Sequence, residues 1–320
     1  MSYTHFTTND RVCLLNLIRV QKLRISEAAR IIKKDKGSVS RELRRNSVKG
    51  EYNPSEAAEQ YAKRKRSCGA KRKLIEGTKA YECVVSGLLQ DWSPDQIVNV
   101  LKPKVSVSTI YRGFHNKTLV RYQQHFRQLT YKRGWKKGRK RESPFKDCRT
   151  IRERPKEVAK RKEFGHWELD TLHFSRKADK YAAVFVERKS RLPKLVLLDD
   201  LKSETMRDAV VNSFKELPVQ ARKTLTLDRG TEFLLWQEIE AKLPETMIYF
   251  CDPVRPWQKG TVENTNGLLR QYYPKCKHTP APTAAELAIV EARLNNRPRK
   301  CLNYSTPQKL FEDFIKKCCT

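Results

Sequence analysis

The stretch HWELDTLHFS, residues 166–175, decides the fold of the second half of this chain. Its apolar and polar residues recur with the period of a half-buried β-strand. Two similar stretches, KYAAVFVERKS (180–190) and LPKLVLLDD (192–200), follow with only short breaks. We therefore predict three consecutive strands joined as a meander.

Helical and strand patterns alternate after this meander. The sequence predicts a helix over 203–216, a strand over 223–228, a helix over 232–242 and a strand over 247–251. A meander followed by β-α-β alternation is typical of a mixed sheet covered by helices. We expect an α/β domain with a five-stranded mixed sheet.

Two aspartates occupy unusual places in these predicted strands. Asp170 lies inside the first strand, where a charged side chain is rarely buried without a reason. Asp228 ends the fourth strand, just before Arg229 and Gly230, and the carboxyl ends of strands in α/β sheets collect catalytic groups. The alternative for Asp228 is a structural role, capping the turn before the glycine.

A third acid lies in the segment PWQKGTVENTNG, residues 256–267. Gly260 ends a loop, and the residues after it predict a helix on which Glu263, Asn266 and Arg270 share one face. Taken alone, Glu263 only complements the dipole of the helix. Together with Asp170 and Asp228, it suits a site of hard oxygen ligands for two Mg²⁺ ions.

The charge of the chain is concentrated in its first half. The net charge is +31 over 320 residues; residues 1–160 carry 39 Lys and Arg against 15 Asp and Glu, a net of +24. This favours a polyanion as partner, and nucleic acid over a membrane surface, because no basic amphipathic helix with bulky aromatic residues is predicted. No apolar run reaches the ~18 residues of a membrane span. The nine cysteines contain no C-x-x-C pair, which argues against a zinc site and favours reduced thiols in a cytosol.

Residues 8–46 predict three short helices, of which SVSRELRRN (38–46) is the third. Val39 and Leu43 are spaced to face a core, which leaves small hydroxyls and arginines outside. Such a surface suits the recognition helix of a helix-turn-helix unit; the alternative is a solvated basic face. The candidate DNA-binding residues are Ser38, Ser40, Arg41, Arg44 and Arg45.

A second unit of this kind is predicted further along. In WSPDQIVNVL (92–101), Ser93, Pro94 and Gln96 form a capping-box pattern. The following helix, SVSTIYRGF (106–114), should turn Ile110 and Tyr111 inward. The candidate DNA-binding residues here are Ser108, Thr109 and Arg112.

These patterns give a predicted domain order. It comprises a helix-turn-helix domain (1–60), a basic linker (61–80), a second helix-turn-helix-like module (81–130), a second basic linker (131–160) and a catalytic domain with C-terminal helices (161–320).

Several long motifs carry a family resemblance. GHWELDTL, FVERKSR, LTLDRGTEF, DPVRPWQKGTVENTNGLLRQYYPK and LNNRPRKCLNYSTP, with SRELRRN and WSPDQI before them, resemble the bacterial DDE transposases of the insertion sequence thirty family. The likeness covers nearly the whole chain. One departure is Arg229, which stands where the family usually has Asn after the second aspartate.

The resemblance implies an RNase H-like catalytic domain behind helix-turn-helix modules. It implies that Asp170, Asp228 and Glu263 are the catalytic residues and bind two Mg²⁺ ions, or Mn²⁺ in their place, during cleavage and transfer of DNA strands. The implied partners are the terminal inverted repeats of the element, target DNA and further copies of the chain. The implied location is the cytoplasm of a bacterium, in association with the nucleoid. We also expect Lys259 and Arg270 to contact DNA phosphate.

Two other functions fit parts of the sequence. A DNA-binding regulator with an inactivated catalytic domain is favoured only by Arg229, since all three acids are present. An RNA-cleaving nuclease would not need two helix-turn-helix units, which suit duplex DNA because side chains do not enter the narrow major groove of RNA.

Overall fold

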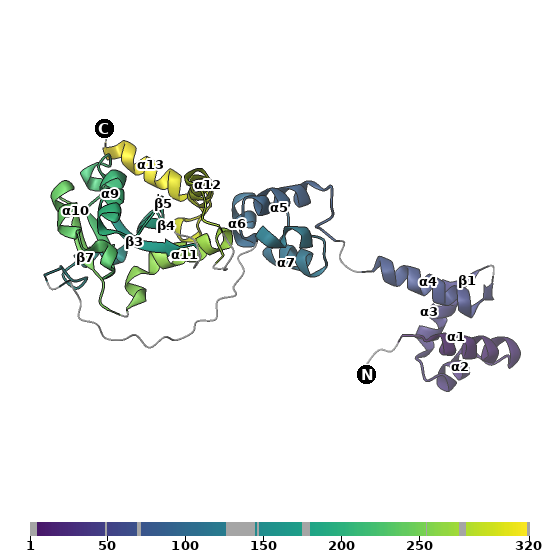
Figure 1. The fold of residues 1–320 in the computed structure, drawn as a ribbon. Coiled ribbons are helices and arrows are strands. Elements are labelled where there is room, and N and C mark those ends of the chain that lie inside the picture. Colours follow the sequence, from purple (N-terminus) through teal and green to yellow (C-terminus); the bar gives the residue numbers. More distant parts are fainter. Residues whose placement is uncertain are drawn as a thin grey trace. The chain divides into compact units, whose positions relative to one another are not determined.

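The computed structural model describes residues 5–48, 50–68, 72–125, 145, 147–174, 180–253, 255–274 and 280–318. The chain forms two compact units, Met1–Arg72 and Lys73–Thr320, and Figure 1 labels most of their helices and strands. None of the helices in these ranges is both long and apolar enough to cross a membrane.

The first unit is helical, as predicted. Its elements are α1 (Thr8–Leu15), the π-helical turn η1 (Asn16–Val20), α2 (Ile25–Ile31), α3 (Lys36–Asn46), the short strands β1 (Ser47–Val48) and β2 (Glu51–Tyr52), and α4 (Pro54–Ser67). Val39 is fully buried and Leu43 packs against the same core, so α3 turns the predicted face inward. Arg11 of α1 and Glu42 of α3 form a buried ion pair of 2.6 Å.

Helix α4 runs through the first part of the stretch 61–80, for which the sequence predicted a linker. Asn53 caps its start and Pro54 occupies its first turn. Within the helix, Arg64 donates a 2.6 Å hydrogen bond to Oδ1 of Asn46 at the end of α3. The basic residues before Ser67 therefore extend a helix of the first unit.

The second unit begins with another small helical module. Its elements are α5 (Lys79–Leu89), α6 (Pro94–Val100), α7 (Val107–His115) and the 3₁₀-helix η2 (Val120–His125). The capping box of Ser93 and Gln96 is present at α6, and Ile110 is fully buried. The inward placement of Tyr111 was wrong: the residue after Ile110 lies about 100° further around the helix, and Tyr111 is half exposed.

The rest of the unit is built on one five-stranded sheet. Its strands are β3 (His166–His173), β4 (Tyr181–Glu187), β5 (Pro193–Leu198), β6 (Thr224–Leu227) and β7 (Met247–Phe250). The order is β5-β4-β3-β6-β7; β3, β4 and β5 are antiparallel neighbours, whereas β6 and β7 run parallel to β3. This confirms the predicted five-stranded mixed sheet.

Helices and short turns connect and cover the strands. They are α8 (Glu157–Lys160), α9 (Ser203–Phe214), η3 (Val219–Ala221), η4 (Thr231–Phe233), α10 (Trp236–Lys242), η5 (Pro256–Lys259), α11 (Gly260–Tyr272), α12 (Ala284–Asn295), η6 (Lys300–Leu302) and α13 (Pro307–Cys318). The helix predicted from residue 232 begins only at Trp236, because Thr231–Phe233 forms a separate 3₁₀ turn.

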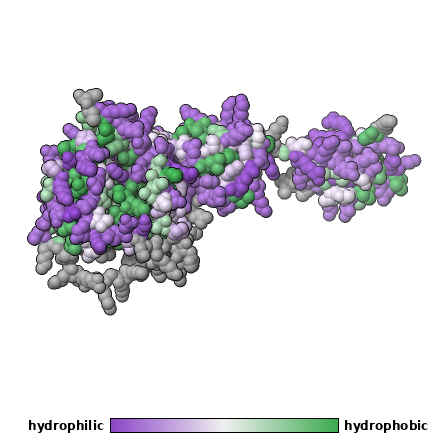
Figure 2. Space-filling view, turned by 45° about the horizontal axis from the view of Figure 1, so that its top comes forward, coloured by the Kyte–Doolittle hydropathy of each residue, from purple (hydrophilic) through white to green (hydrophobic). Residues whose placement is uncertain are grey.

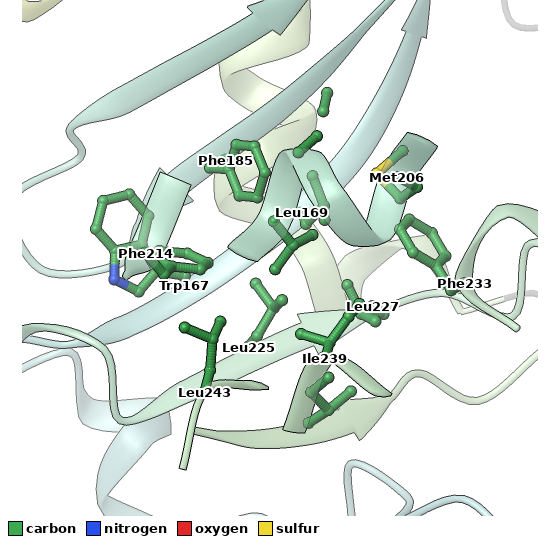
Figure 3. Close-up of a cluster of buried hydrophobic side chains, with 14 of the residues drawn as sticks. Trp167, Leu169, Phe185, Met206, Phe214, Leu225, Leu227, Phe233, Ile239 and Leu243 are labelled. Carbon is green, nitrogen blue, oxygen red and sulfur yellow. The ribbon is translucent and has the colours of Figure 1, made fainter. Parts of the chain in front are cut away.

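Alternation along the strands divides the core between the two faces of the sheet. Trp167 and Leu169 of β3 point to one face and pack with residues of α9 and α10 (Figure 3). Phe311 of α13 belongs to the same cluster. Leu172 of β3 and Val184 of β4 point to the opposite face, where α11 and α12 cover them. Since successive strand residues alternate, Glu168 and Asp170 lie on the face covered by α11.

The last part of the predicted linker 131–160 contributes to this domain. Thr150 bridges to Phe250 at the edge strand β7, and the backbone N–H of Ile151 donates to the carbonyl of Phe250 at 2.8 Å. Phe145 is buried in the core beside Phe250. Residues 126–144 lie outside the described residues.

The helical module of residues 73–125 is joined to the sheet domain by a buried aspartate. Asp91 Oδ1 lies 2.8 Å from Nδ1 of His125, whereas its Oδ2 accepts hydrogen bonds from Tyr272 of α11 at 2.8 Å and Arg293 of α12 at 3.2 Å. Asp91 thus links the module to two helices of the sheet domain.

The surface in view is mostly hydrophilic, with hydrophobic residues in small groups (Figure 2).

Candidate active site

Asp170 on β3 lies level with Asp228, which directly follows the neighbouring parallel strand β6. Strand β3 pairs with β6 in a register that sets Glu168 opposite Thr226. Two residues further on, the same register brings Asp170 beside Asp228, which follows the last residue of β6. The structure therefore brings together two of the three predicted catalytic acids.

Both aspartates bind one ammonium group. Nζ of Lys259 lies 3.0 Å from Oδ1 of Asp170 and 2.9 Å from Oδ2 of Asp228, and it also donates to the carbonyl of Leu169 at 3.3 Å. The Lys259 side chain is only 7% exposed. Burial opposes its positive charge, but the two carboxylates outweigh burial and raise the pKa of Lys259.

Helix α11 presents its predicted face to β3. Asn266 donates a 2.7 Å hydrogen bond from Nδ2 to Oδ2 of Asp170, and Arg270 donates to the carbonyl of His173, at the end of β3, at 2.8 Å. Glu263 precedes Asn266 by one turn on this face and is partly exposed. The helix therefore carries the third acid along the strand that holds the first.

Lys259 and Arg270 both have partners inside the protein. Lys259 is bound by the two aspartates, and Arg270 donates to the backbone carbonyls of His173 and Tyr273. In this arrangement neither the ammonium of Lys259 nor the guanidinium of Arg270 is freely exposed to bind a DNA phosphate. Their contact with DNA stays a prediction that requires a change of partners.

Arg229 does not take the place of a metal beside Asp228. Among the described residues, the ion pair of Asp228 is the one with Lys259, and Arg229 makes none with it. The Nε of Arg229 is buried, and no acceptor in the described ranges binds it. Arg229 therefore does not occupy the carboxylate of Asp228.

Glu168 is a buried acid that the sequence reasoning missed. It is fully buried, and its carboxylate accepts hydrogen bonds from the N–H groups of Thr261 and Val262, from the Thr261 hydroxyl and from Arg188. The available signal was its position two residues before Asp170, which puts both acids on one face of a strand.

The carboxylates suit the divalent metal that the family resemblance implies. Asp170 and Asp228 already hold one cationic group between hard oxygen atoms, the ligand type that Mg²⁺ prefers. The described residues contain no cluster of three or more His, Cys, Asp or Glu side chains with the geometry of a metal site. Asp170 and Asp228 are therefore placed to share a cation, and the ammonium of Lys259 lies between them. Glu263 follows Lys259 closely in the sequence, on the helix that covers this face of the sheet.

The predicted DNA-binding residues of the first unit lie on the outer side of α3. Ser40, Arg41, Arg44 and Arg45 are exposed and Ser38 is half-buried. Arg41 donates to the carbonyl of Gly37 and to the hydroxyl of Ser38, at 3.1 and 3.3 Å. This surface carries positive charge and hydroxyl groups on one helix, as predicted.

Helix α7 offers a smaller surface. Ser108 and Arg112 are exposed, whereas Thr109 is half-buried and its hydroxyl lies 2.9 Å from that of Ser106, the N-cap residue. Tyr111 adds an exposed aromatic ring to this surface.

Comparison with known proteins identifies relatives along almost the whole chain. No family model matches. The transposase InsI of insertion sequence element IS30A from Escherichia coli (strain K12) is 34% identical over 310 residues, which cover 91% of this chain and 79% of that protein. The transposase of element IS1086 from Cupriavidus metallidurans is 32% identical and covers 94% and 92% of the two chains. That of element IS4351 from Bacteroides fragilis is 30% identical and covers 98% and 97%.

Solved structures show a weaker likeness. The catalytic core domain of BIV integrase is 18% identical with a TM-score of 0.39, over 49% of this chain and 99% of that one. At this level of likeness the structure adds nothing to what the sequence relatives show. Because relatives at 30–34% identity span nearly its whole length and carry the name of transposase, the chain belongs to the IS30 family of insertion-sequence transposases.

Proposed function

We propose that the catalytic centre of this transposase consists of Asp170, Asp228 and Glu263, and that these acids hold two Mg²⁺ ions. The observation that carries the proposal is the convergence of Asp170 and Asp228 on one cationic nitrogen. Two carboxylates from adjacent parallel strands meet there, and the helix that bears Glu263 covers the same face of the sheet. Such a set of oxygen ligands suits DNA strand cleavage and strand transfer.

Mg²⁺ held by Asp170, Asp228 and Glu263 would supply the activation of an attacking water or DNA 3′-hydroxyl and the neutralisation of charge on the leaving oxygen. The chain supplies the ligands and their orientation. Asn266 donates a hydrogen bond to Oδ2 of Asp170, and the β3–β6 register fixes Asp170 beside Asp228.

Lys259 has two roles in this proposal. In the described arrangement it neutralises the two aspartates, which would otherwise repel each other. It must leave their oxygens before these bind metal, because the ammonium and the metal compete for the same atoms. Once released at this edge of the sheet, Lys259 is placed to contact a DNA phosphate.

We further propose that the two helical modules bind double-stranded DNA at the inverted repeats of the element. The exposed face of α3, with Arg41 and Arg45, and that of α7, with Arg112, suit insertion into major grooves. The predicted domain order, from 1–60 and 81–130 to 161–320, then places DNA recognition before catalysis in the chain. Target DNA and further copies of the chain complete the proposed assembly.

The test uses the full chain and a duplex that carries the ends of the element, with Mg²⁺ or EDTA. The parent should cleave only with Mg²⁺, and Asp170→Asn and Asp228→Asn should bind the duplex without cleaving it. Asp199→Asn is the matched control, because this aspartate is 87% exposed and pairs with Lys180 instead.

Two results would count against the proposal. Cleavage by Asp170→Asn or Asp228→Asn at the parent rate would remove that residue from the catalytic centre. A parent that binds the ends tightly but cleaves with neither Mg²⁺ nor Mn²⁺ would favour a DNA-binding regulator.

A further inference from the structure

Both carboxylate oxygens of Glu168 accept hydrogen bonds from the start of helix α11, and one of them also accepts a hydrogen bond from an arginine. Its Oε2 accepts the N–H groups of Thr261 and Val262 at 2.8 and 2.9 Å. Its Oε1 accepts the Thr261 hydroxyl at 2.9 Å and Nη1 of Arg188 at 2.6 Å. Glu168 is fully buried and Arg188 is 5% exposed, so water does not share these bonds to any large extent.

Glu168 caps helix α11 from outside the helix. Lys259, the residue at the N-cap position, makes no capping side-chain hydrogen bond within the described part of the chain. The first N–H groups of a helix have no partner inside the helix and attract a negative charge. Glu168 provides both the acceptor and the charge from another element, strand β3.

A second contact fixes the same point of the helix. Nη1 of Arg191 donates to the Thr261 hydroxyl at 3.3 Å. Arg188 and Arg191 both lie at the turn after β4, which the buried carboxylate of Glu187 stabilises by accepting the N–H groups of Lys189 and Ser190. The start of α11 is therefore tied to β3 and to the β4–β5 turn.

The tied residues stand between two groups of the catalytic centre. Thr261 and Val262 directly precede Glu263, and Lys259, which binds both aspartates, lies two residues before Thr261. On β3, Glu168 lies two residues before Asp170 and on the same face. The bonds of Glu168 thus join the strand that carries the first acid to the helix that carries the third.

We propose that Glu168 is a positioning residue for strand cleavage: it fixes the first turn of α11 against β3 and thereby sets Glu263 against Asp170, with Arg188 as its counter-charge. This inference rests on the proposed catalytic role of Asp170 and Glu263. Glu168 itself does not touch substrate in this account, because its carboxylate is buried and fully engaged. A rate loss without a binding loss is the expected signature, since small displacements of reacting groups slow the chemical step.

The test compares Glu168→Gln with Glu291→Gln in the full chain. Glutamine keeps the size of the side chain but turns an N–H₂ group toward donors, so at least one of the four bonds is lost. Glu291 is the matched control: it is a partly buried carboxylate on α12, away from the start of α11, and it accepts the backbone N–H of Leu195 at 2.5 Å.

Four readouts are taken on the same preparations. In Glu168→Gln, single-turnover cleavage at saturating DNA should fall on the order of 100-fold, the Mg²⁺ concentration for half-maximal rate should rise, and binding of the element ends should stay unchanged. Amide hydrogen exchange at Thr261 and Val262 should accelerate in this variant alone. Glu291→Gln should keep the parent rate and Mg²⁺ dependence.

The outcomes separate this inference from the proposed function. If exchange at Thr261 and Val262 accelerates in Glu168→Gln while cleavage and its Mg²⁺ dependence stay at parent values, Glu168 serves the fold alone and the inference is overturned. An equal rate loss in Glu291→Gln would overturn it as well. If Glu168→Gln fails to fold, Glu168→Asp, which keeps the charge but shortens the reach, takes its place with the same expected pattern. A parent that cleaves no DNA would instead contradict the proposed function.

Discussion

Lys259 holds Asp170 and Asp228 together at the cost of occupying the oxygens that a metal would need. Its Nζ is within 3.0 Å of both carboxylates. Asp228 is 47% exposed, so solvent weakens its share of the attraction. The ammonium of Lys259 offsets the negative charge of the two carboxylates, so a metal cation can replace it at the same oxygens.

Replacing Lys259 by methionine should destabilise the protein in EDTA and increase its response to metal. The two aspartates then repel each other, and we expect a loss of about 1 kcal/mol after allowing for solvent at Asp228. Thermal unfolding in EDTA and in Mg²⁺ measures both effects, with Lys180→Met, which loses an exposed partner of Asp199, as control. A rise of the midpoint with Mg²⁺ no larger than in the parent would show that Lys259 does not compete with metal.

His166 makes the stability of the sheet domain depend on pH. It is buried, and its Nδ1 lies 2.9 Å from the Thr224 hydroxyl. Burial and, after it, the charge of Lys223 lower the pKa of His166 to about 4, with Glu163 opposing them only in part. Because the unfolded chain takes up this proton near pH 6.5, stability should fall as pH drops from about 6.5 toward 4, by on the order of 3 kcal/mol.

The comparison with His166→Asn tests this dependence. Asparagine keeps a polar atom near Thr224 but does not titrate. Between pH 7.5 and pH 5 the variant should lose about 2 kcal/mol less stability than the parent, measured by urea unfolding. Equal losses in the two proteins would assign the acid sensitivity to other groups.

The three acids proposed as catalytic could be selected from the sequence, but the residues that contact them could not. Asp170 and Asp228 were visible because a strand and a strand end are unusual places for a charge. The contact of Lys259 with Asp170 could not be predicted, since nothing local shows that this lysine reaches an aspartate 89 positions earlier. Glu168 was overlooked for the same reason: its partners are 20 and 93–94 positions away.

Strands and helices with strong periodicity were predicted well, and their ends less so. The five strands and α9 appear where the apolar pattern placed them. The start of α10 was set too early, because the 3₁₀ turn of Thr231–Phe233 has a similar residue pattern. Helix α4 was not predicted, and its last turns were assigned to a linker, because a run of lysines and arginines resembles a linker until Arg64 is seen against Asn46.

The exposed arginines of α3 give a prediction about sequence recognition. Arg41→Ala or Arg45→Ala should weaken binding to the element ends by ~1–3 kcal/mol and relax the preference at one or two base pairs, because arginine reads guanine edges in the major groove. Neutralising Lys136 and Lys137 should weaken all duplexes alike. Footprints and competition with scrambled duplexes measure the difference, and equal loss of discrimination in both sets would contradict the assignment of α3.

At the level of the whole second unit, Asp91 joins the α5–α7 module to the catalytic domain. It is 4% exposed and shared by His125, Tyr272 and Arg293. The sequence did not predict this junction, because Tyr272 and Arg293 follow Asp91 by 181 and 202 positions. A module expected to be separate is thus seated on the end of the helix that carries Glu263.

Asp91→Asn should loosen this junction. Removing one partner from a buried charged group costs on the order of 3 kcal/mol, and we expect faster amide exchange in α5–α7 and at the end of α11. Asp95→Asn is the control, because Asp95 accepts the Tyr304 hydroxyl at the same junction but is more exposed. Unchanged exchange in Asp91→Asn would mean that other contacts hold the module.

Glu263 is the proposed catalytic acid outside the pair that Lys259 bridges. Glu263→Gln keeps the size of the side chain and removes its charge. Mg²⁺ prefers anionic oxygen, so cleavage and strand joining should be abolished. Binding of the element ends should persist, because the positive charge lies mainly in the first half of the chain.

The most direct measurement is cleavage and binding of the element ends by Glu263→Gln and the parent, made on the same preparations with Mg²⁺. The account predicts parent-like binding with no cleavage. Cleavage at the parent rate would return Glu263 to a role in the helix dipole alone. Loss of binding together with cleavage would mean that α11 supports the fold or the DNA rather than a metal site, and would contradict the account.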